Sequence, residues 1–343
     1  MQADLEYILN HTGNIFKGLN GKKILLTGGT GFLGKWILES FLFAIREGSL
    51  DIKLYILSRN PEAFNIHFPH LFTPPFFTYL KGDVTDFKFP ELNFDYIIHA
   101  ATEASARLNH EQPLVMFDSI INGTRNVLEF ARERNVKRIL YISSGAVYGA
   151  QPVGLNGFPE NFLGGPDPLL ASSAYAEAKR SAELLCACYC KLYNIEIPVA
   201  RCFAFVGPYL DLDTHFAIGN FIRNGLNGED IVIKGDGKPM RSYMYAADLV
   251  IWLLHILLDG RSEAYNVGSD EAISIRELAY KVASFFPGLT VDILNQSNPT
   301  DRNQNYIPDT QKAMESFNLS NSIDLEESIR RTIGFHKKSL KND

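Results

Sequence analysis

Tyr175 and Lys179 lie four residues apart in a segment with helical spacing of apolar residues, so they share one helix face. An unperturbed tyrosine has a pKa of about 10, and about one molecule in a thousand is therefore ionised at pH 7. A neighbouring ammonium stabilises the phenolate, and lowering the pKa by about three units requires roughly 4 kcal/mol. Such a pair suits proton exchange with a substrate, although the same spacing is also common on solvated helices.

A glycine-rich stretch, TGGTGFLG from Thr27 to Gly34, stands between a strand-like run and a helix-like run. Gly28 permits a tight turn, Gly31 lets the backbone approach a diphosphate, and Gly34 lets the helix pack close to the sheet. Free N–H groups at the helix start would hold the phosphates. The stretch therefore predicts a dinucleotide site built from Gly28, Thr30, Gly31, Phe32, Leu33 and Gly34.

The elements that must position these residues alternate along the chain. Strand-like apolar runs cover 22–27, 52–57, 77–80, 94–99 and 138–143, and helical patterns cover 32–45 and 114–134. Nearly continuous apolar strands separated by helices indicate a parallel sheet covered on both faces. We therefore predict an α/β fold with a doubly wound parallel sheet of the Rossmann type.

The regular alternation fades from about Phe203, where shorter elements such as 231–233 and 246–258 follow. We predict a dinucleotide-binding Rossmann domain over 1–202 and a smaller C-terminal α/β substrate lobe over 203–343. Segments of the two are expected to be interleaved. The N-terminal segment is expected to form a docking helix.

Composition excludes several classes of partner. The net charge of −6 over 343 residues gives no general attraction to nucleic acid or anionic lipid. The N-terminal MQADLEYILNHTGN has no long apolar core, so we expect a cytoplasmic protein without a membrane partner. Cys186, Cys188 and Cys190 have no His or second cysteine pair nearby, and we expect core residues and no metal site.

Glycines spaced G-x-x-G-x-x-G resemble those of extended short-chain dehydrogenases/reductases, and the resemblance covers nearly the whole chain. The further matching stretches are Gly82-Asp83-Val84, His99-Ala100-Ala101, Asn122-Gly123-Thr124 with Asn126, the serine strand SSGAVYG over 143–149, YAEAK over 175–179, Arg201 with Gly207-Pro208, Gly235-Asp236-Gly237 with Arg241, and Pro308-Asp309 with Lys312. The chain is identified as a member of the NAD(P)-dependent nucleotide-sugar epimerase and dehydratase family.

This resemblance implies an enzyme that transfers hydride at C4 of a nucleotide-diphosphate sugar. Tyr175 would exchange the hydroxyl proton, Lys179 would lower the pKa of Tyr175, and Ser144 would hydrogen-bond the reacting oxygen. The remaining implied cofactor residues are Asp83, Val84, Ala100 and Ala101, and the implied substrate residues are Ser144, Arg241 and Gly207. A homodimer through two helices, one carrying Tyr175, is also implied, and the apolar segment 184–193 is compatible with it.

The end of the second strand, Leu57-Ser58-Arg59-Asn60, bears on the cofactor type. An acidic residue there would bond the ribose 2′-hydroxyl of NAD, and this chain has none. Ser58 and Arg59 can instead receive a 2′-phosphate, so NADP is favoured over NAD. The alternative is that Arg59 stacks on adenine and that NAD is used.

Two departures from the family pattern narrow the range of reactions that this chain could catalyse. Dehydratases carry an Asp-Glu pair after the residue equivalent to Ser144, whereas this chain has Gly145 and Ala146, which exchange no protons. We therefore favour a C4 epimerase or 4-ketoreductase over a 4,6-dehydratase, unless Glu103 or another carboxylate enters the site. Ala204 and Ser242 replace a usual Asn and Asp, and the sugar and base stay open.

Two other classes of function remain as alternatives. A non-catalytic dinucleotide-binding sensor would not need Tyr175, Lys179 and Ser144 together. A reductase of a small ketone would leave the loop from Gly235 to Arg241 without a purpose.

Overall fold

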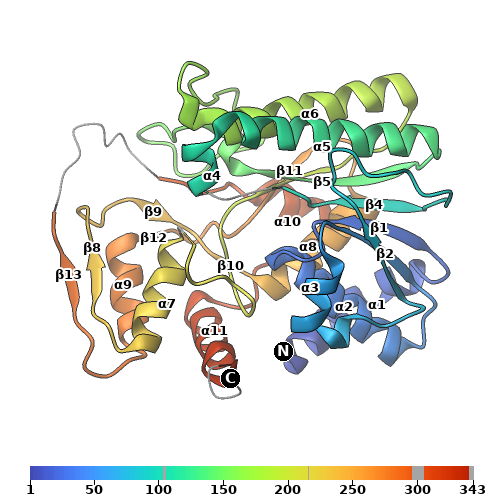
Figure 1. The fold of residues 1–343 in the computed structure, drawn as a ribbon. Coiled ribbons are helices and arrows are strands. Elements are labelled where there is room, and N and C mark those ends of the chain that lie inside the picture. The colour runs from blue at the N-terminus through green and yellow to red at the C-terminus, as the bar shows by residue number, and fades with distance from the viewer. Residues whose placement is uncertain (103–105, 215, 296–304, 340–343) are drawn as a thin grey trace.

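The protein is built around a seven-stranded parallel sheet in the order β11-β6-β5-β4-β1-β2-β3 (Figure 1). The computed structural model describes residues 1–102, 106–214, 216–295 and 305–339. The strands are β1 (Lys23–Thr27), β2 (Lys53–Ser58), β3 (Phe77–Lys81), β4 (Tyr96–His99), β5 (Arg138–Ser144), β6 (Val199–Cys202) and β11 (Ala264–Val267). The strand order reverses between β1 and β4, and ligands of such sheets bind at the carboxyl ends beside the reversal. The predicted Rossmann fold is confirmed.

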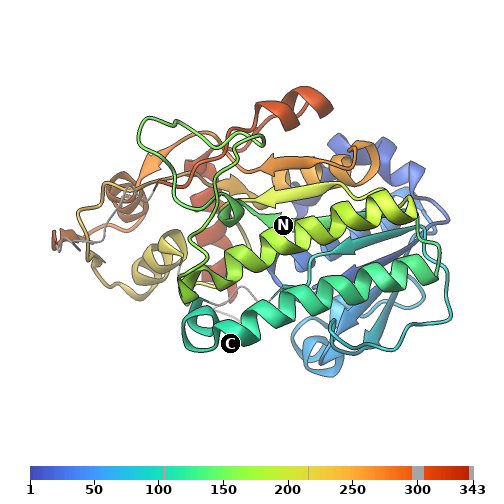
Figure 2. The same cartoon turned by 90° about the horizontal axis from the view of Figure 1, so that it is seen from above.

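Helices cover both faces of this sheet, as Figures 1 and 2 show. One face carries α1 (Gln2–Gly18), α2 (Phe32–Gly48) and α8 (Ala246–Asp259), and the other carries α5 (Pro113–Glu133) and α6 (Ala174–Tyr193). Because both faces are covered, β1 and β5 are buried along nearly their whole length and read as continuous apolar runs. The expected docking helix is α1, which packs on α2 and α8.

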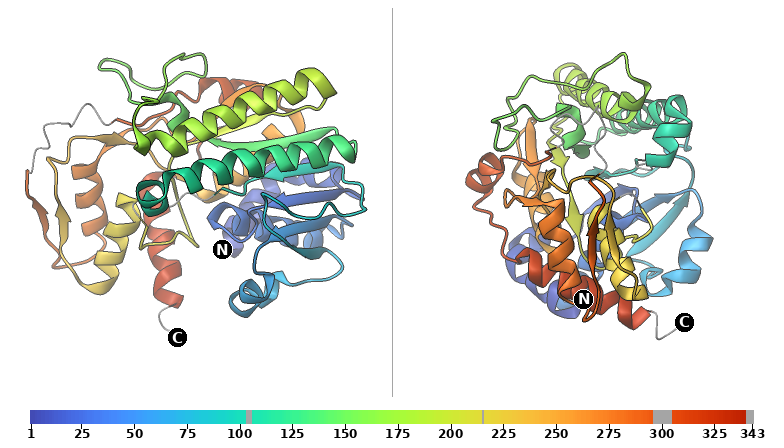
Figure 3. Two further views of the ribbon diagram at one scale, coloured as in Figure 1. Left: turned by 45° about the horizontal axis from the view of Figure 1, so that its top comes forward. Right: turned by 90° about the vertical axis from the view of Figure 1, so that its left-hand side faces the viewer.

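A smaller lobe lies beyond the carboxyl ends of the strands, at the left of Figure 1 and in both views of Figure 3. It contains α7 (Ala217–Asn227), α9 (Ile275–Ala283), β8 (Ile231–Ile233) paired with β13 (Val291–Ile293), and β9 (Met240–Arg241) paired with β12 (Ile273–Ser274). It has its own apolar core, which includes Phe221, Leu278 and Phe286. The chain nevertheless returns to the large sheet through α8 and β11, so segments of the two parts alternate.

Helix α11 (Leu325–Ser339) joins the two parts of the molecule. It contacts α7 and two short strands, β7 (Phe205–Val206) and β10 (Met244–Tyr245). Arg331 of α11 also forms an ion pair with the buried carboxylate of Asp4 in α1. Segments far apart in the sequence are thereby tied together.

The cysteines of α6 differ from the expectation in one respect. Cys186 is buried and Cys190 is partly buried, but Cys188 is exposed, because residues two apart on a helix point to different sides. In the described ranges, no three His, Cys, Asp or Glu residues gather as a metal site. No helix within these ranges has the length and apolar character needed to cross a membrane.

Candidate active site

The glycine turn between β1 and α2 is shaped by crowding from main-chain atoms. Gly28 has a φ of +76°, and a Cβ there would lie 2.6 Å from the carbonyl carbon of Ala100. A Cβ on Gly34 would lie 2.3 Å from the carbonyl oxygen of Gly28. These two glycines are therefore required by the fold.

Gly31 differs from its two neighbours in the motif. A Cβ there would meet only the carbonyl oxygen of Gly28, at the ordinary contact distance of 3.5 Å. Gly31 is the N-cap of α2, and no side chain caps this helix start. The chain thus leaves room and free N–H donors in front of α2, as an anionic group requires.

A cavity of about 850 Å³ opens at this turn and runs between the sheet and the smaller lobe. It brings together every predicted catalytic residue and every predicted cofactor residue. Of the two predicted substrate residues that are not also catalytic, Arg241 and Gly207, it includes Arg241. Those that line it are Gly28, Thr30, Gly31, Phe32, Leu33, Gly34, Ser58, Arg59, Asp83, Val84, Ala100, Ala101, Ser144, Tyr175, Lys179 and Arg241. Its volume suits a ligand of the size of a dinucleotide with a second molecule beside it.

Gly207 is the predicted substrate residue that the structure does not bring to this cavity. A Cβ there would lie 2.9 Å from the Cβ of Ala246 and 3.5 Å from the ring of Trp36. The Trp36 indole N–H donates to the carbonyl of the next residue, Pro208, at 2.8 Å. Gly207 therefore serves the packing of α2 against α8. The loop from Gly235 to Gly237 is likewise absent from the cavity lining.

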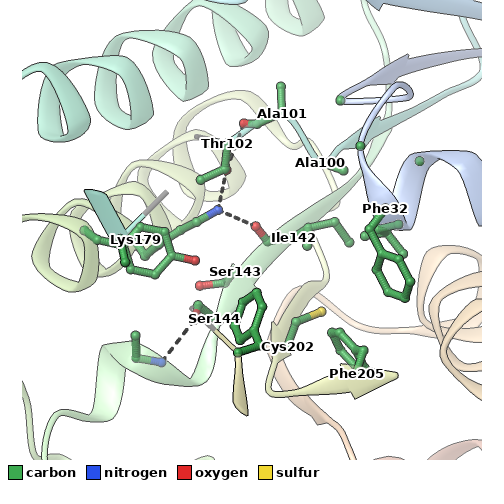
Figure 4. A pocket seen from close by; sticks show the side chains of 18 of the residues that line it. Phe32, Ala100, Ala101, Thr102, Ile142, Ser143, Ser144, Lys179, Cys202 and Phe205 are labelled. Atoms are coloured by element: carbon green, nitrogen blue, oxygen red, sulfur yellow. Dashed lines mark hydrogen bonds between the residues drawn. The ribbon is translucent and has the colours of Figure 1, made fainter. Parts of the chain in front are cut away.

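Lys179 is buried beneath the cavity and is held by two hydrogen bonds, as Figure 4 shows. Its Nζ donates to Thr102 Oγ1 at 2.6 Å and to the carbonyl oxygen of Ile142 at 2.7 Å. Burial lowers the pKa of Lys179 to about 8. Thr102 was not identified from the sequence, since a threonine after a strand carries no distinctive pattern.

Tyr175 departs from the expected electrostatics. Burial raises the pKa of Tyr175, and a hydrogen bond with Ser144 offsets only part of this effect. The expected lowering by Lys179 is therefore not met in the folded chain, where the ammonium is already engaged by Thr102 and Ile142. The phenol is consequently in its protonated form at neutral pH.

Ser144 ends β5 and caps the short helix η2 (Gly145–Tyr148). The backbone N–H of Ala146 donates to Ser144 Oγ at 3.2 Å, which fixes the hydroxyl at the cavity wall (Figure 4). The phenols of Tyr175 and Tyr306 line the same cavity, and burial raises the pKa of both while Ser144 lowers it in part. The expected serine and tyrosine are thus joined by a second tyrosine that the sequence patterns did not reveal.

The wall beyond Ser144 is mostly aromatic. It includes Phe203, Phe205, Phe216, Tyr243 and Tyr306. Arg241 lies among them and donates to the carbonyl of Met240 at 2.9 Å, and burial lowers its pKa. This end of the cavity therefore offers stacking surfaces around one guanidinium.

Space at Gly145 is taken by two of these aromatic residues. A Cβ on Gly145 would lie 2.5 Å from the ring of Phe203 and 2.7 Å from the hydroxyl of Tyr306. An acidic side chain at 145 would therefore displace both rings. Among the described lining residues, Asp83 is the one carboxylate, and Glu103 lies outside the described residues.

Asp83 and Arg59 stand together at the β2 and β3 end of the cavity, remote from Ser144 in the fold. Burial alone would raise the pKa of Asp83, but hydrogen bonds from Thr85 and the charge of Arg59 outweigh it and lower the pKa. Ser58 is buried beside them, whereas Arg59 is exposed. This end of the cavity is therefore lined by a hydroxyl, a guanidinium and a carboxylate.

Known proteins match this chain in sequence. The NAD dependent epimerase/dehydratase family matches residues 24–268. UDP-glucuronic acid decarboxylase 1 of Arabidopsis thaliana is 29% identical over 335 residues, covering 97% of this chain and 74% of that protein.

Solved structures match it in fold. The UDP-glucose 4-epimerase of Thermotoga maritima, solved with UDP-glucose, has a TM-score of 0.79 at 22% identity, covering 93% of this chain and 99% of its own. The UDP-glucose 4-epimerase of Thermus thermophilus, solved with NAD, has a TM-score of 0.77 at 23% identity, covering 92% and 99%. Because the family match spans more than half of the chain, from the glycine turn through Tyr175 and Lys179, the chain belongs to the NAD dependent epimerase/dehydratase family.

Proposed function

We propose that this protein transfers hydride at C4 of a nucleotide-diphosphate sugar, as a 4-ketoreductase or C4 epimerase. One observation carries the proposal: Ser144, Tyr175 and Lys179 meet at the end of a cavity that starts at the glycine turn, and no described lining carboxylate lies beside them. Hydride transfer at an alcohol carbon needs one group that exchanges a proton. Elimination of water needs further acids and bases, for which this end has no described carboxylate.

A nicotinamide dinucleotide fits the residues of the turn. The uncapped start of α2 and the open face of Gly31 would hold the diphosphate, and Ser58, Arg59 and Asp83 would hold the adenosine end. When bound, this cofactor supplies or accepts the hydride. We favour NADP because Ser58 and Arg59 can receive a 2′-phosphate, although the Thermus thermophilus relative was solved with NAD.

Tyr175 would carry the proton. In reduction, the phenol gives its proton to the C4 oxygen as the carbonyl becomes an alcohol, and in oxidation the phenolate takes it back. Because burial raises the pKa of Tyr175, the resting phenol is protonated and ready to act as an acid. This state suits the reductive direction, in which the phenol donates its proton.

Ser144 and Lys179 would support that transfer. Ser144 is fixed by the N–H of Ala146 and would orient the C4 oxygen beside the phenol. Lys179 is anchored beneath the site through Thr102 and Ile142, where its charge would favour the phenolate after proton loss. Arg241 would hold the diphosphate of the sugar nucleotide, since it is the lining cation on the substrate side.

Decarboxylation of a nucleotide uronic acid is the second candidate, because the Arabidopsis relative bears that name. Oxidation at C4 of a uronic acid gives a β-keto acid, which loses carbon dioxide without a further carboxylate in the protein. Arg241 would then hold the substrate carboxylate instead of the diphosphate.

The test is turnover by the purified protein. A 4-keto-6-deoxy nucleotide sugar with NADPH or NADH, UDP-glucose with either oxidised cofactor, and UDP-glucuronic acid are compared in parallel. Consumption of reduced cofactor supports the reductase, interconversion of C4 epimers supports the epimerase, and release of carbon dioxide supports the decarboxylase. Turnover that survives in Tyr175→Phe contradicts the mechanism, and dinucleotide binding without any turnover points to a sensor.

A homodimer through α5 and α6 is also proposed. These helices pack side by side on one face of the molecule (Figure 2), and α6 exposes Leu184 and Leu192 by 66% and 68%. Burial of such side chains in a symmetric interface is favourable. Light scattering on Leu184→Asp should show monomers where the unmodified protein shows dimers, and an unchanged mass would contradict this interface.

A further inference from the structure

Helix α6, which carries Tyr175, begins without a cap from its own N-cap residue. Ser173 holds that position with φ and ψ of −79° and −3°, which continue the short helix η3 (Ala171–Ser173), and its side chain makes no capping hydrogen bond. The first N–H groups of a helix have no acceptor within that helix. A partner from elsewhere in the chain can therefore stabilise the start of α6.

That partner is Asn109, in the short helix α4 (Ala106–Glu111). Its Oδ1 accepts from the backbone N–H of Tyr175 at 3.0 Å, and its Nδ2 donates to the carbonyl of Ser172 at 2.9 Å. Only this orientation of the amide satisfies both bonds, since the reverse one would face donor with donor. We call this pair of hydrogen bonds the Asn109 clamp.

Asn109 is itself held by the packing of α4. The neighbouring Leu108 packs against the apolar core between the sheet and helices α5 and α6. The N–H of Gln112 donates to the carbonyl of Leu108 at 2.8 Å, directly before α5 begins. The Asn109 side chain is half-buried and lines the cavity, as Tyr175 and Ser144 do. The amide therefore lies at the cavity together with the phenol whose backbone it holds.

We propose that Asn109 is a positioning residue: by holding the start of α6, it determines where the phenol of Tyr175 lies beside Ser144. This role rests on the proposed function, in which Tyr175 exchanges a proton with the C4 oxygen. Tyr175 lies in the first turn of α6, where helices fray, whereas Lys179 lies one turn further and has two hydrogen bonds of its own. Loss of the Asn109 clamp should therefore displace Tyr175 more than Lys179.

The first test is Asn109→Ala, which removes both bonds of the Asn109 clamp. Proton transfer depends on the position of the phenol, and a displacement of about 1 Å can cost about 10²-fold in rate. We expect kcat in the reductive direction to fall by about tenfold or more, while KM for the sugar nucleotide stays within about twofold. A rise in KM without a fall in kcat would mean that Asn109 contacts the substrate instead, and it would overturn the positioning role.

Asn20→Ala is the matched control. Asn20 Oδ1 likewise accepts from a backbone N–H, that of Asp51 at 2.7 Å, but Asn20 precedes β1 and does not line the cavity. Both alanine variants should lose similar thermal stability, and Asn20→Ala should keep its kcat. If kcat falls in proportion to the melting temperature in both variants, Asn109 only stabilises the fold, and the proposal is overturned.

Asn109→Asp separates the bond to Tyr175 from the bond to Ser172. A carboxylate keeps an acceptor for the Tyr175 N–H and suits a helix start, but it cannot donate to the carbonyl of Ser172. Its negative charge also favours the protonated phenol, which reduction requires. We expect this variant to recover most of the reductive kcat. A kcat as low as that of Asn109→Ala would show that the bond to Tyr175 does not position the phenol.

Hydrogen exchange separates this proposal from the proposed function, because it needs no substrate. Exchange is followed by mass spectrometry in peptides that cover residues 171–178. Loss of a hydrogen bond at the helix start should speed exchange there about five- to tenfold in Asn109→Ala and leave it unchanged in Asn20→Ala. Unchanged exchange in Asn109→Ala would overturn the proposal. If no nucleotide sugar is turned over, the proposed function fails, and exchange still decides whether Asn109 holds the start of α6.

Discussion

The two ends of the cavity are built in different ways. At the cofactor end, Gly28 and Gly34 are demanded by main-chain atoms of the same turn and of the next strand. At the substrate end, Phe203, Arg241 and Tyr306 come from three separate segments of the chain, and a single main-chain bridge joins Tyr306 to Arg241. The first construction fixes the shape of the turn through main-chain contacts, whereas the second depends mainly on side chains that can be changed one at a time. Changes at the cofactor end should therefore affect stability and binding together, and changes at the substrate end should affect activity alone.

The largest effect on activity is expected for Tyr175→Phe. The proton carrier is lost while the ring stays in place, so kcat should fall by about 10³-fold or more. The melting temperature should stay within a few degrees of the unmodified protein. A matching loss of stability would contradict the separation of activity from fold at this end.

A buried histidine at the cofactor end should make the stability of the fold sensitive to acid. His99 is buried between Thr27 and Thr124, and burial, with the charge of Lys179, lowers its pKa to about 3. The unfolded chain binds this proton below about pH 6.5, so stability falls as pH decreases from 6.5 toward 3. Against His99→Gln, the unmodified protein should lose about 3 kcal/mol more between pH 6.5 and pH 4. Equal losses of unfolding free energy in the two proteins, measured by urea unfolding, would show that His99 does not contribute to the acid sensitivity.

Gly34→Ala tests whether the turn couples stability to binding. The new methyl would lie 2.3 Å from the Gly28 carbonyl oxygen, and we expect a loss of about 1–3 kcal/mol in the free energy of unfolding together with loss of dinucleotide binding.

Gly31→Ala is the control in the same turn. Its methyl has room in the protein, so unfolding should change little while dinucleotide affinity falls. Equal destabilisation by both alanines in calorimetry would remove the distinction between the two glycines.

Arg241→Gln tests the substrate end of the cavity. Removing a charged donor to a diphosphate should raise the KM for the sugar nucleotide by about 10- to 100-fold, the equivalent of roughly 1.5–3 kcal/mol. The KM for the cofactor should not change. An equal rise in both constants would mean that Arg241 serves the cofactor instead.

The smallest expected effect concerns cofactor choice. Arg59→Ala should weaken NADPH binding by about tenfold and leave NADH binding nearly unchanged, since one charge-assisted hydrogen bond contributes about 1.5 kcal/mol. Titration calorimetry with both cofactors measures the ratio. Equal weakening would support the alternative that Arg59 stacks on adenine.

The cofactor end of the cavity could be predicted from the sequence because its requirements are local. The glycine turn and the helix spacing of Tyr175 and Lys179 lie within single segments, where backbone geometry restricts residue type. Tyr306 and Thr102 carry no such restriction, since Tyr306 packs on Phe203 and Thr102 accepts from Lys179, both of which lie far away along the chain. Gly207 matched a family pattern, yet its neighbours Ala246 and Trp36 show a packing role that pattern alone does not distinguish.

The electrostatics of the site was the second feature that the sequence could not predict. Tyr175 and Lys179 both line the cavity, but the sign of a pKa shift depends on burial and on competing partners. The partners of Lys179 were unknown until Ile142 and Thr102 were seen beside it. Desolvation therefore decided the direction of the shift for Tyr175.

The ion pair between Asp4 and Arg331 has a consequence for synthesis of the chain. A ribosome releases Asp4 more than three hundred residues before its partner, and the carboxylate is buried in the finished protein. Until Arg331 emerges, the Asp4 carboxylate lacks one of its two ion-pair partners, so α1 should dock less tightly during translation. Formation of α11 at the end of synthesis would then complete the docking of α1.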